Sequence, residues 1–440
     1  MELNELKERL RSHGVVGAGG AGFPSYAKLS EQADTVILNC AECEPLLKVH
    51  RQVLEVYTYE VLFALSEILR ATGAKRGIVA IKAHYHSALE ALQAEIGAFP
   101  KLSVHTLDSV YPAGDEIILI KEVTGRTVQP GRLPVSVGVT VCNVESVYNV
   151  YGAMQGRSVT DKYVTVAGEV HAPVTLRVPL GTSISELIAA AGGATSENVV
   201  LLSGGPMMGR IVSGRDPVTK TTNAILVLPR DHAVVMNKQR NGKVHLRRAM
   251  SVCCQCHSCT DLCSRNVIGY PVKPHLVMRV LSNGGRGDVK ALEGSLFCSG
   301  CGLCETYSCP QGLSPRALIA EMKAALRQAG LKLPEGVEAN VDVRDANLKK
   351  VSVERLTMRL GLKKYDVSAP LREEFVTKKV KLLTAQHLGA PCVPVVAVGD
   401  LVKKGDVIAK APEGALGVDL HASINGTVTS VQKNYIQIQA

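Results

Sequence analysis

Eight cysteines in two short runs have a spacing that suits iron–sulfur chemistry. Each run places three cysteines at successive i, i+3 positions and adds a fourth further along, so three thiolates can face one cubane cluster and the fourth its neighbour. Pro310 directly follows the second run. The pattern predicts two [4Fe–4S] clusters, with the last cysteine of each run crossing to the other cluster. The predicted ligand sets are Cys253, Cys256, Cys259 and Cys309 for one cluster, and Cys298, Cys301, Cys304 and Cys263 for the other.

Structural zinc is the alternative for repeated Cys-x-x-Cys units. A tetrahedral zinc site uses two separated pairs, which leaves the third cysteine of each run without a role. Ser264 stands where a proline usually follows the first run, and the second run has one extra residue before Cys309. Both differences change loop shape rather than ligand number. Cys254 is out of register and is interpreted as a spare buried thiol.

The composition predicts a soluble protein of roughly three domains in its 440 residues. Apolar residues make up 46% of the chain, without a stretch long enough to span a bilayer. The net charge is +10, with basic residues concentrated at 238–248 and 349–381. This basic surface is either simply solvated or steers acidic partners and phosphate-bearing cofactors. With no Trp and five Phe, a stacking surface for nucleic acid is poorly supplied, so no nucleic-acid partner is expected.

The elements that must position these residues follow from the apolar pattern. Up to residue 156, buried strands alternate with helices, which predicts a parallel sheet layered with helices. Within it we expect strands at 35–39, 77–83 and 102–107, and helices at 45–71 and 86–96. Segments of short strands and turns follow, one before the cysteine runs and one after them. The expected domains are an α/β domain at 1–156, a β-grasp module at 157–232, a helical cysteine domain at 245–330, a basic helical connector at 331–379 and a β domain at 380–440.

A glycine-rich loop, Gly17-Ala-Gly19-Gly20-Ala-Gly22-Phe23-Pro24, is the second chemical feature. Its Gly-x-Gly-x-x-Gly spacing formally matches the dinucleotide fingerprint, and Glu42 lies about 20 residues further on. Glycines there let backbone N–H groups approach a phosphate closely. A simple tight turn is the equally weighted alternative. No Gly-Lys-Ser/Thr follows, so the loop is not of the Walker type.

Three further segments give the loop a family context. They are Asn39-Cys-Ala-Glu42-Cys-Glu44-Pro45, Tyr111-Pro-Ala-Gly114-Asp115-Glu116 and Cys142-Asn143-Val-Glu145-Ser. Together with the loop they resemble the flavin-binding subunit of respiratory complex I and, more closely, the C subunit of Rnf electron-transport complexes. The resemblance covers most of residues 10–320 and implies a Rossmann-like domain that binds FMN and NADH. It also implies that residues 163–229 are a soluble ligand-binding β-grasp module and that the cysteines form a two-cluster ferredoxin-like segment.

The resemblance also implies roles for particular residues. The FMN phosphate would contact the loop glycines and Lys28, and the nicotinamide side would be formed by Phe23 and Glu44. Cys40 and Cys43, which flank Glu42, are interpreted as packing residues rather than a redox pair. The loop positions are Gly17, Gly19, Gly20 and Gly22, and the residues lining the isoalloxazine and ribityl chain are Asn39, Glu42, Tyr111, Gly114, Asp115, Glu116 and Asn143.

Residues 382–439 resemble the barrel-sandwich domain that normally begins the Rnf C subunit. They also resemble a lipoyl domain, but the segment Gly417-Val-Asp419-Leu has no lysine at the expected hairpin tip, so no lipoyl attachment is expected. The order of flavin domain, β-grasp module, two clusters and C-terminal barrel-sandwich resembles the cobalamin reductases of propanediol-utilisation microcompartments. That family implies electron transfer from NADH through FMN and two [4Fe–4S] clusters to a corrinoid, reducing cob(III)alamin to cob(II)alamin and cob(I)alamin.

From that resemblance we expect no residue to act as a general acid or base, because hydride and electron transfer need placement rather than proton donors. The expected partners are the corrinoid, a cobalamin adenosyltransferase and microcompartment shell proteins. The expected location is the cytoplasm, inside a bacterial microcompartment. Two rival functions remain: a peripheral electron-relay subunit of an Rnf-like membrane complex, and a structural zinc module with an empty glycine loop.

Overall fold

The computed structural model describes residues 1–340 and 349–440. A four-stranded sheet in the order β3-β2-β1-β5 forms the centre of the N-terminal domain, and all its neighbouring strands are parallel. The order reverses between β1 and β5, so their carboxyl ends flank a crevice of the kind in which α/β sheets bind ligands. The strands are β1 (Thr35–Cys40), β2 (Arg76–Lys82), β3 (Leu102–Leu107) and β5 (Val139–Asn143). The predicted Rossmann-like sheet is confirmed.

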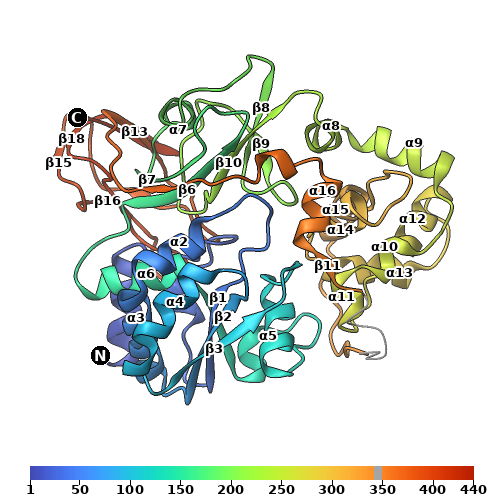
Figure 1. Ribbon diagram of the computed structural model, residues 1–440, viewed down its shortest axis with the longest axis horizontal. Helices are drawn as coiled ribbons and strands as arrows, with labels where there is room; N and C mark the ends of the chain where they lie inside the picture. Colours follow the sequence, from blue (N-terminus) through green and yellow to red (C-terminus); the bar gives the residue numbers. More distant parts are fainter. Residues whose placement is uncertain (341–348) are drawn as a thin grey trace.

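Helices cover both faces of this sheet (Figure 1). The first of them buries Leu3, Leu6 and Leu10, as its apolar spacing predicts. The single helix predicted at 45–71 is wrong, because Tyr57 leaves helical geometry (φ −120°, ψ 41°). Its ring packs against Tyr148 with centroids 4.3 Å apart, and this tertiary contact overrides the local helix propensity. The helices are α1 (Leu3–Ser12), α2 (Val49–Val56), α3 (Thr58–Thr72), α4 (His86–Glu95), α5 (Glu116–Thr124) and α6 (Val144–Met154).

A mixed six-stranded sheet in the order β12-β7-β6-β10-β8-β9 follows. One helix, α7 (Ile184–Ala190), packs on it and begins with a capping box between Ser183 and Glu186. This is the predicted β-grasp module, with one strand added from the distant connector. Its strands are β6 (Asp161–Gly168), β7 (Val174–Pro179), β8 (Val199–Ser203), β9 (Arg210–Val212), β10 (Ala224–Pro229) and β12 (Leu371–Arg372).

Short helices carry the cysteine runs, as predicted. Ala249, Met278 and Leu318, from three of these helices, are buried together as a small core. Proline opens α12 and α15, where the missing N–H costs no helical hydrogen bond. The helices are α8 (Ala233–Gln239), α9 (Gly242–Val252), α10 (Ser258–Asp261), α11 (Ser264–Val267), α12 (Pro274–Ser282), α13 (Val289–Gly294), α14 (Leu303–Thr306) and α15 (Pro315–Gln328).

The connector at 331–379 is not a continuous helix, so that prediction is wrong for its described part; residues 341–348 lie outside the described residues. It contains one α-helix, α16 (Val353–Arg359), among the described residues. It also donates β11 (Val351–Ser352), which pairs with β4 (Val110–Tyr111), as well as β12. The connector contains little helix because its residues pair with strands of two other domains. Gly361 (φ +70°) also ends its helix.

The C-terminal domain is built from two small antiparallel sheets, in the orders β13-β19-β18-β15 and β14-β16-β17. Val380, Ile408, Ile436 and Ile438 are fully or nearly fully buried and belong to the same core as helix α1. The barrel-sandwich expectation is confirmed. Its strands are β13 (Lys379–Leu383), β14 (Val393–Pro394), β15 (Leu401–Val402), β16 (Val407–Lys410), β17 (Leu420–His421), β18 (Gly426–Gln432) and β19 (Tyr435–Gln439).

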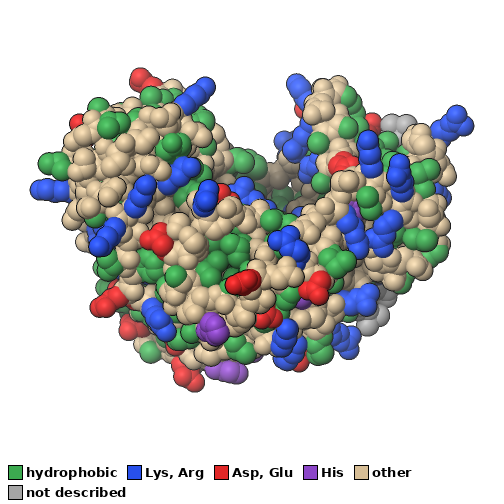
Figure 2. All heavy atoms as spheres, turned by 90° about the horizontal axis from the view of Figure 1, so that it is seen from above, with side chains coloured by type: hydrophobic (Ala, Val, Ile, Leu, Met, Phe, Trp, Pro, Cys, Tyr) green, Lys and Arg blue, Asp and Glu red, His purple; other side chains and the backbone are tan. Residues whose placement is uncertain are grey.

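The cysteine-bearing helices and the C-terminal domain lie on opposite sides of the molecule, with the parallel sheet and the β-grasp module between them (Figure 1). Figure 2 shows a face hollowed between two lobes, with Lys and Arg side chains along the hollow. Among the described residues, no helix is both long and apolar enough to cross a membrane.

Candidate functional site

Asparagine side chains mark the crevice where β1 and β5 end. Asn39 lies near the end of β1, and its Nδ2 donates to the carbonyl of Gly114 at 2.9 Å. Asn143 ends β5, and its Oδ1 accepts two N–H groups from the first turn of α6 at 3.0 and 3.4 Å. Its Nδ2 lies 2.8 Å from Nε2 of His50, whose pKa is lowered by burial. Both amides are therefore fixed by the backbone around the crevice.

The glycine loop is closed on itself. The N–H of Gly17 donates to the carbonyl of Phe23 at 2.9 Å, and Val16 and Pro24 form an antiparallel bridge. The loop precedes β1 and leads into a short 3-10 helix, Ser25–Lys28. It therefore lacks the strand–loop–helix context that the dinucleotide fingerprint requires.

Gly19 brings the loop backbone directly over the crevice. A Cβ atom at this position would stand 2.4 Å from Nδ2 of Asn143 and 3.3 Å from Cε1 of His50. At Gly20 a Cβ atom would meet nothing within 4 Å, and the residue is exposed. The N–H of Ala18 is held by Oγ of Ser146 at 2.8 Å. Only glycine permits the close approach at position 19, whereas position 20 is open.

Residues from two other domains anchor the base of the loop. The buried Nζ of Lys220, in the β-grasp module, donates to the carbonyls of Gly14 at 2.8 Å and Asp419 at 3.2 Å. Burial lowers the pKa of Lys220 to about 8. The N–H of Leu388, in the C-terminal domain, donates to the carbonyl of Gly22 at 3.2 Å. Gly22 has φ +73°, so a residue with a side chain would be strained there.

Glu42 is buried in the crevice with one carboxylate oxygen unused. Its Oε1 accepts the N–H of His50 at 3.0 Å, while Oε2 is buried and has no hydrogen-bond partner among the described residues. Its backbone has φ +26°, outside the usual regions for a residue with a side chain. The carbonyl of Glu42 accepts from Nζ of Lys82 at 3.2 Å and from the hydroxyl of Tyr85 at 3.3 Å. A buried cation thus lies against the backbone of Glu42.

Lys28 and Glu116 form a half-exposed ion pair at 3.6 Å, next to the glycine loop. Nζ of Lys28 also donates to the carbonyl of Val141, in β5, at 3.4 Å. The pair brings the 3-10 helix and the start of α5 to the same edge of the crevice. Exposed ion pairs of this kind stabilise little, so Lys28 can exchange its partner for a ligand anion.

Cys40 and Cys43 behave as packing residues. Burial raises the pKa of both thiols, to about 11 for Cys43. The Sγ of Cys43 accepts the N–H of Gly114 at 3.3 Å. A reactive cysteine needs a lowered pKa, so neither thiol has the character of a redox residue.

The Glu44 side chain contacts the β-grasp module. Its two carboxylate oxygens accept the N–H groups of Met207 at 3.0 Å and Met208 at 2.8 Å. Burial raises the pKa of Glu44, and these two hydrogen bonds oppose the rise. Phe23 is half-buried within the glycine loop. The two residues expected at the nicotinamide side therefore belong to different walls of the site.

The first group of cysteines shares one cavity. Cys253, Cys256, Cys259 and Cys309 all line it, although Cys309 comes from the second run. Burial first, and then the charges of Cys309, Cys253 and Cys256, raise the pKa of Cys259 to about 12. The chain thus brings together the four residues of the first predicted ligand set. Cys254 also lines this cavity but is exposed, so its interpretation as a buried thiol is wrong.

The second group is gathered around Cys304. Its pKa is raised by burial and then by neighbouring charges that include Cys298, Cys301 and Cys263. Cys263 and Cys304 are buried, and Cys298 and Cys301 are half-buried. Cys263 comes from the first run, so residues of both runs lie near Cys304, and their ligation of one cluster stays a prediction. Within the described residues, no three His, Cys, Asp or Glu side chains are close enough to chelate a single metal ion.

The second cysteine group adjoins the flavin-type crevice. The hydroxyl of Tyr111 donates to the carbonyl of Cys301 at 2.6 Å. Asp115 caps α5 and pairs with Arg265 at 2.8 Å, and the two side chains are only 13% and 11% exposed. Arg265 follows Cys263 by two residues, and its Nε and Nη1 are buried without a hydrogen-bond partner among the described residues.

These features fit FMN and iron–sulfur clusters, the cofactors that the sequence implies. Backbone exposed at Gly19 and an unused oxygen on Glu42 suit a flavin with its phosphate and hydroxyl groups. Unused donors on Arg265, two residues after Cys263, suit a negatively charged iron–sulfur cluster. We call the crevice between the carboxyl ends of β1 and β5 the flavin crevice. We call the two predicted ligand sets the first and the second cysteine group.

Four functional neighbours were missed in the sequence. His50 reaches the crevice and Lys220 the base of the glycine loop, and neither has a local signal in the sequence. Lys82 ends a buried strand, where a charged residue is unusual, and that anomaly was the available clue. Arg265 lies beside a predicted ligand, and a cation next to Cys263 was visible in the sequence.

Family models match all four structural parts. Residues 10–152 match the Nuo51 FMN-binding domain, and residues 163–211 match the SLBB domain. Residues 252–314 match a 4Fe-4S dicluster domain. Residues 360–440 match the RnfC barrel sandwich hybrid domain, which includes the second half of the connector.

Similar proteins extend over the whole chain. The cobalamin reductase PduS of Citrobacter freundii is 42% identical over 99% of this chain and 97% of its own length. Its counterpart from Salmonella typhimurium is 41% identical over 100% of this chain and 97% of its own length. The C subunit of the Na⁺-translocating ferredoxin:NAD⁺ oxidoreductase complex of Acetobacterium woodii is 33% identical over 58% of each chain.

Among solved structures, the NAD⁺-reducing [NiFe]-hydrogenase in its H₂-reduced state has a similar fold. The TM-score is 0.51 at 21% identity, and the match covers 81% of this chain and 67% of the hydrogenase chain. At this identity the likeness concerns the fold alone.

Proposed function

Because the chain belongs to the cobalamin reductase family, we propose that it passes electrons from NADH through FMN and two [4Fe–4S] clusters to a corrinoid. It is an oxidoreductase with an FMN-binding domain and a 4Fe-4S dicluster domain. The proposed reaction takes cob(III)alamin to cob(II)alamin and then to cob(I)alamin.

FMN would be held by the flavin crevice. The backbone at Gly17, Gly19, Gly20 and Gly22 would receive the phosphate, with Lys28 supplying a cation. Gly19 supports this role because its backbone must lie against Asn143 without an intervening side chain. The flavin ring and ribityl chain would be lined by Asn39, Glu42, Tyr111, Gly114, Asp115, Glu116 and Asn143.

The two cysteine groups would each hold one [4Fe–4S] cluster. Bound FMN exchanges two-electron hydride chemistry for single electrons, which iron–sulfur clusters conduct one at a time. The residues of this chain contribute placement: glycines for close approach, thiolates for ligation and Arg265 for positive charge near the second group. No side chain is required as a general acid or base.

The contact between the flavin crevice and the second cysteine group carries this proposal. Tyr111, a predicted flavin neighbour, donates to the carbonyl of the predicted ligand Cys301 at 2.6 Å. The nearly buried pair of Asp115 and Arg265 closes the same boundary. Electrons leaving the crevice would therefore reach the Cys263, Cys298, Cys301 and Cys304 group before the other one.

Phe23 and Glu44 remain our candidates for the nicotinamide side. Both oxygens of Glu44 are engaged by backbone N–H groups of the β-grasp module, so Glu44 would shape that wall rather than bind a hydroxyl directly.

We also propose a location inside a bacterial microcompartment, with shell proteins and a cobalamin adenosyltransferase as partners. The proposed location and partners are based on the membership of this chain in the cobalamin reductase family.

An anaerobic absorbance experiment tests the donor, the path and the acceptor in turn. Protein reconstituted with iron, sulfide and FMN is mixed with NADH, and oxidised cobalamin is then added. We expect NADH to bleach the flavin and cluster absorbance, and cobalamin to restore it while the spectrum of reduced cobalamin grows. Protein prepared without FMN is the control.

Two outcomes would contradict parts of the proposal. Bleaching without corrinoid turnover would exclude the corrinoid as acceptor and would favour a protein acceptor, as in an Rnf-like complex. An unchanged spectrum after NADH would exclude NADH as the donor.

A further inference from the structure

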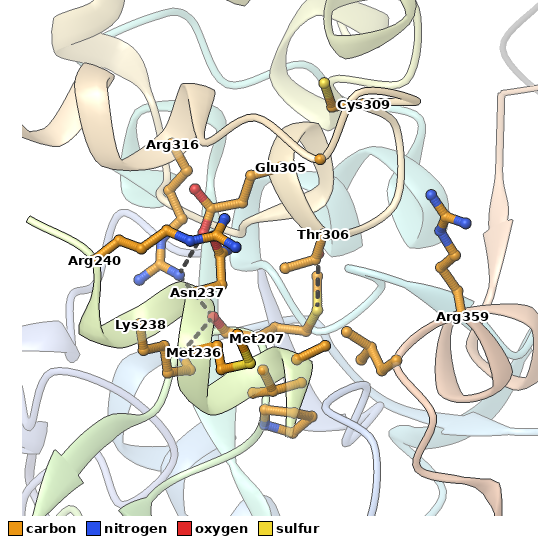
Figure 3. A pocket seen from close by; sticks show the side chains of 15 residues that line it. Met207, Met236, Asn237, Lys238, Arg240, Glu305, Thr306, Cys309, Arg316 and Arg359 are labelled. Carbon is orange, nitrogen blue, oxygen red and sulfur yellow. Dashed lines mark hydrogen bonds and ion pairs between the residues drawn. The ribbon is translucent and has the colours of Figure 1, made fainter. Parts of the chain in front are cut away.

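A cavity of about 300 Å³ lies beside the cysteine groups and has no role in the flavin crevice (Figure 3). Cys309 lines it and also lines the cavity shared by the other three cysteines of the first group. Glu305 and Thr306, which directly follow Cys304, line it as well. A molecule in this cavity would therefore touch segments that belong to both cysteine groups.

Positive charge dominates the cavity. Its lining includes the cations Lys238, Arg240, Arg316 and Arg359 and a single carboxylate, Glu305. This imbalance favours an anionic ligand, and guanidinium groups bind phosphate particularly well because their donors are arranged as a fork.

Two of these four cations are engaged by backbone carbonyls of the β-grasp module. Arg316 pairs with Glu305 at 3.5 Å and donates to the carbonyl of Met207 at 2.8 Å. Lys238 donates to the carbonyls of Met207 at 3.2 Å and Gly209 at 2.6 Å. These two cations fix the loop of the β-grasp module that forms one wall of the cavity.

Arg240 and Arg359 have no carboxylate partner among the described residues. Arg240 donates to Oδ1 of Asn237 at 3.2 Å, and its pKa is lowered by burial and then by the charge of Arg248. Arg359 is exposed at the end of α16 and stands across the cavity from Arg240 (Figure 3). A phosphate in the cavity would therefore have two guanidinium groups in the cavity lining to draw on.

The rest of the wall is apolar and adaptable. Met207 is fully buried beneath the cavity, and Met236 leaves 47% of its surface exposed. Val234 and Leu360 complete this side. Methionine side chains adapt to irregular apolar shapes, so the wall suits a flat apolar group joined to the anion.

We propose that this cavity is the docking site of the corrinoid and holds its nucleotide arm, a phosphodiester joined to a flat base. The cavity is at the small end of ligand sites and cannot enclose a corrin ring, but it matches a nucleotide-sized arm. Arg240 and Arg359 bind the phosphate, and the ring lies across the mouth. This inference rests on the proposed function and locates its acceptor.

The electron balance is that of the proposed reaction. Oxidation of one NADH to NAD⁺ releases two electrons and one proton. The two electrons take cobalt from +3 to +1 in single steps, and the proton goes to solvent. No bond forms between the corrinoid and the protein.

Binding of two corrinoids to the reconstituted, oxidised holoprotein tests the site by calorimetry. Cyanocobalamin carries the nucleotide arm, and dicyanocobinamide lacks it. We expect the wild-type protein to bind cyanocobalamin more tightly, and Arg240→Gln and Arg359→Gln each to weaken that binding about tenfold. Affinity for dicyanocobinamide should be the same in all variants, and added salt should weaken only cyanocobalamin binding.

Arg286→Gln is the matched control, because Arg286 is an exposed arginine of the same helical domain that does not line the cavity. FMN and iron content establish that each variant is loaded. Equal affinity of the wild-type protein for the two corrinoids, or undiminished cyanocobalamin binding by both variants, would overturn the docking site. If the wild-type protein still reduces cobalamin with NADH, the proposed function survives that result; if it does not, both are overturned.

Discussion

At the scale of single residues, one thiol of the first run lies outside the predicted ligand sets. The spacing predicts eight cysteine ligands in two crossed sets; the four of the first set line one cavity, and ligation itself stays a prediction. The spacing did not predict that Cys254 is exposed, because its direction depends on the backbone turn at Gln255 (φ +52°). Cys254 and Cys256 are both exposed, and only Cys256 belongs to a predicted ligand set.

That pair allows a controlled test of ligation. Cys256→Ser should lose one cluster, lowering the iron content from about eight to about four per chain. Cys254→Ser should keep the full content, because its thiol is not part of a set. Iron and sulfide analysis after anaerobic reconstitution measures both. Equal losses in the two variants would mean that the assignment of Cys256 is wrong.

At the scale of elements, the glycine loop shows what local sequence can and cannot specify. Its glycines predicted a close backbone approach, and Gly19 makes one. The groups that it approaches, Asn143 and His50, lie far away in the sequence, and their position depends on the parallel order of β1 and β5. A local motif therefore identified the loop but could not identify the wall opposite it.

Gly19→Ala should weaken FMN binding by at least about tenfold. Its Cβ would displace the Asn143 amide, which also caps α6, and loss of a cap costs about 1 kcal/mol. Gly97→Ala is the control, because a Cβ there also meets nothing within 4 Å and Gly97 lies outside the glycine loop. Quenching of flavin fluorescence on titration with protein measures the affinity. Similar affinities for the two variants would show that the loop does not contact FMN.

At the scale of the whole molecule, a buried ion pair fastens the flavin domain to the β-grasp module. Lys162 on β6 pairs with Glu145 on α6, and the two side chains are only 2% and 1% exposed. Nζ of Lys162 also donates to Oδ1 of Asn223 at 2.7 Å, and Glu145 accepts the N–H of Tyr163 at 3.2 Å. The sequence did not predict this pair, because lysine in a strand usually faces water.

Removing one partner of this pair leaves a buried charge uncompensated. Lys162→Met should therefore lower the free energy of unfolding by about 3–5 kcal/mol. Lys162→Met combined with Glu145→Gln should recover most of that loss, because neither charge remains and the glutamine can still accept from Tyr163. The midpoint of urea unfolding compares the variants. A double variant as unstable as Lys162→Met alone would show that packing, rather than charge, is responsible.

The overall architecture was predictable because each domain has its own pattern of periodicity and turns. The contacts between domains were not, since Lys220, Glu44 and the connector strands meet partners far away along the chain. The site is assembled mainly at those contacts. Sequence alone therefore predicted which residue types the site would use, but few of the residues from other domains that surround them.

The anchoring of the glycine loop by the C-terminal domain has a consequence for biosynthesis. The loop precedes Leu388 and Asp419 in the chain, so it leaves the ribosome before the residues that brace its base. Until they emerge, Gly22 lacks its backbone partner and Lys220 lacks one of its two acceptors. A chain that ends before Leu388 would therefore carry the glycine motif without this support, and we expect it to bind FMN less tightly than the full chain.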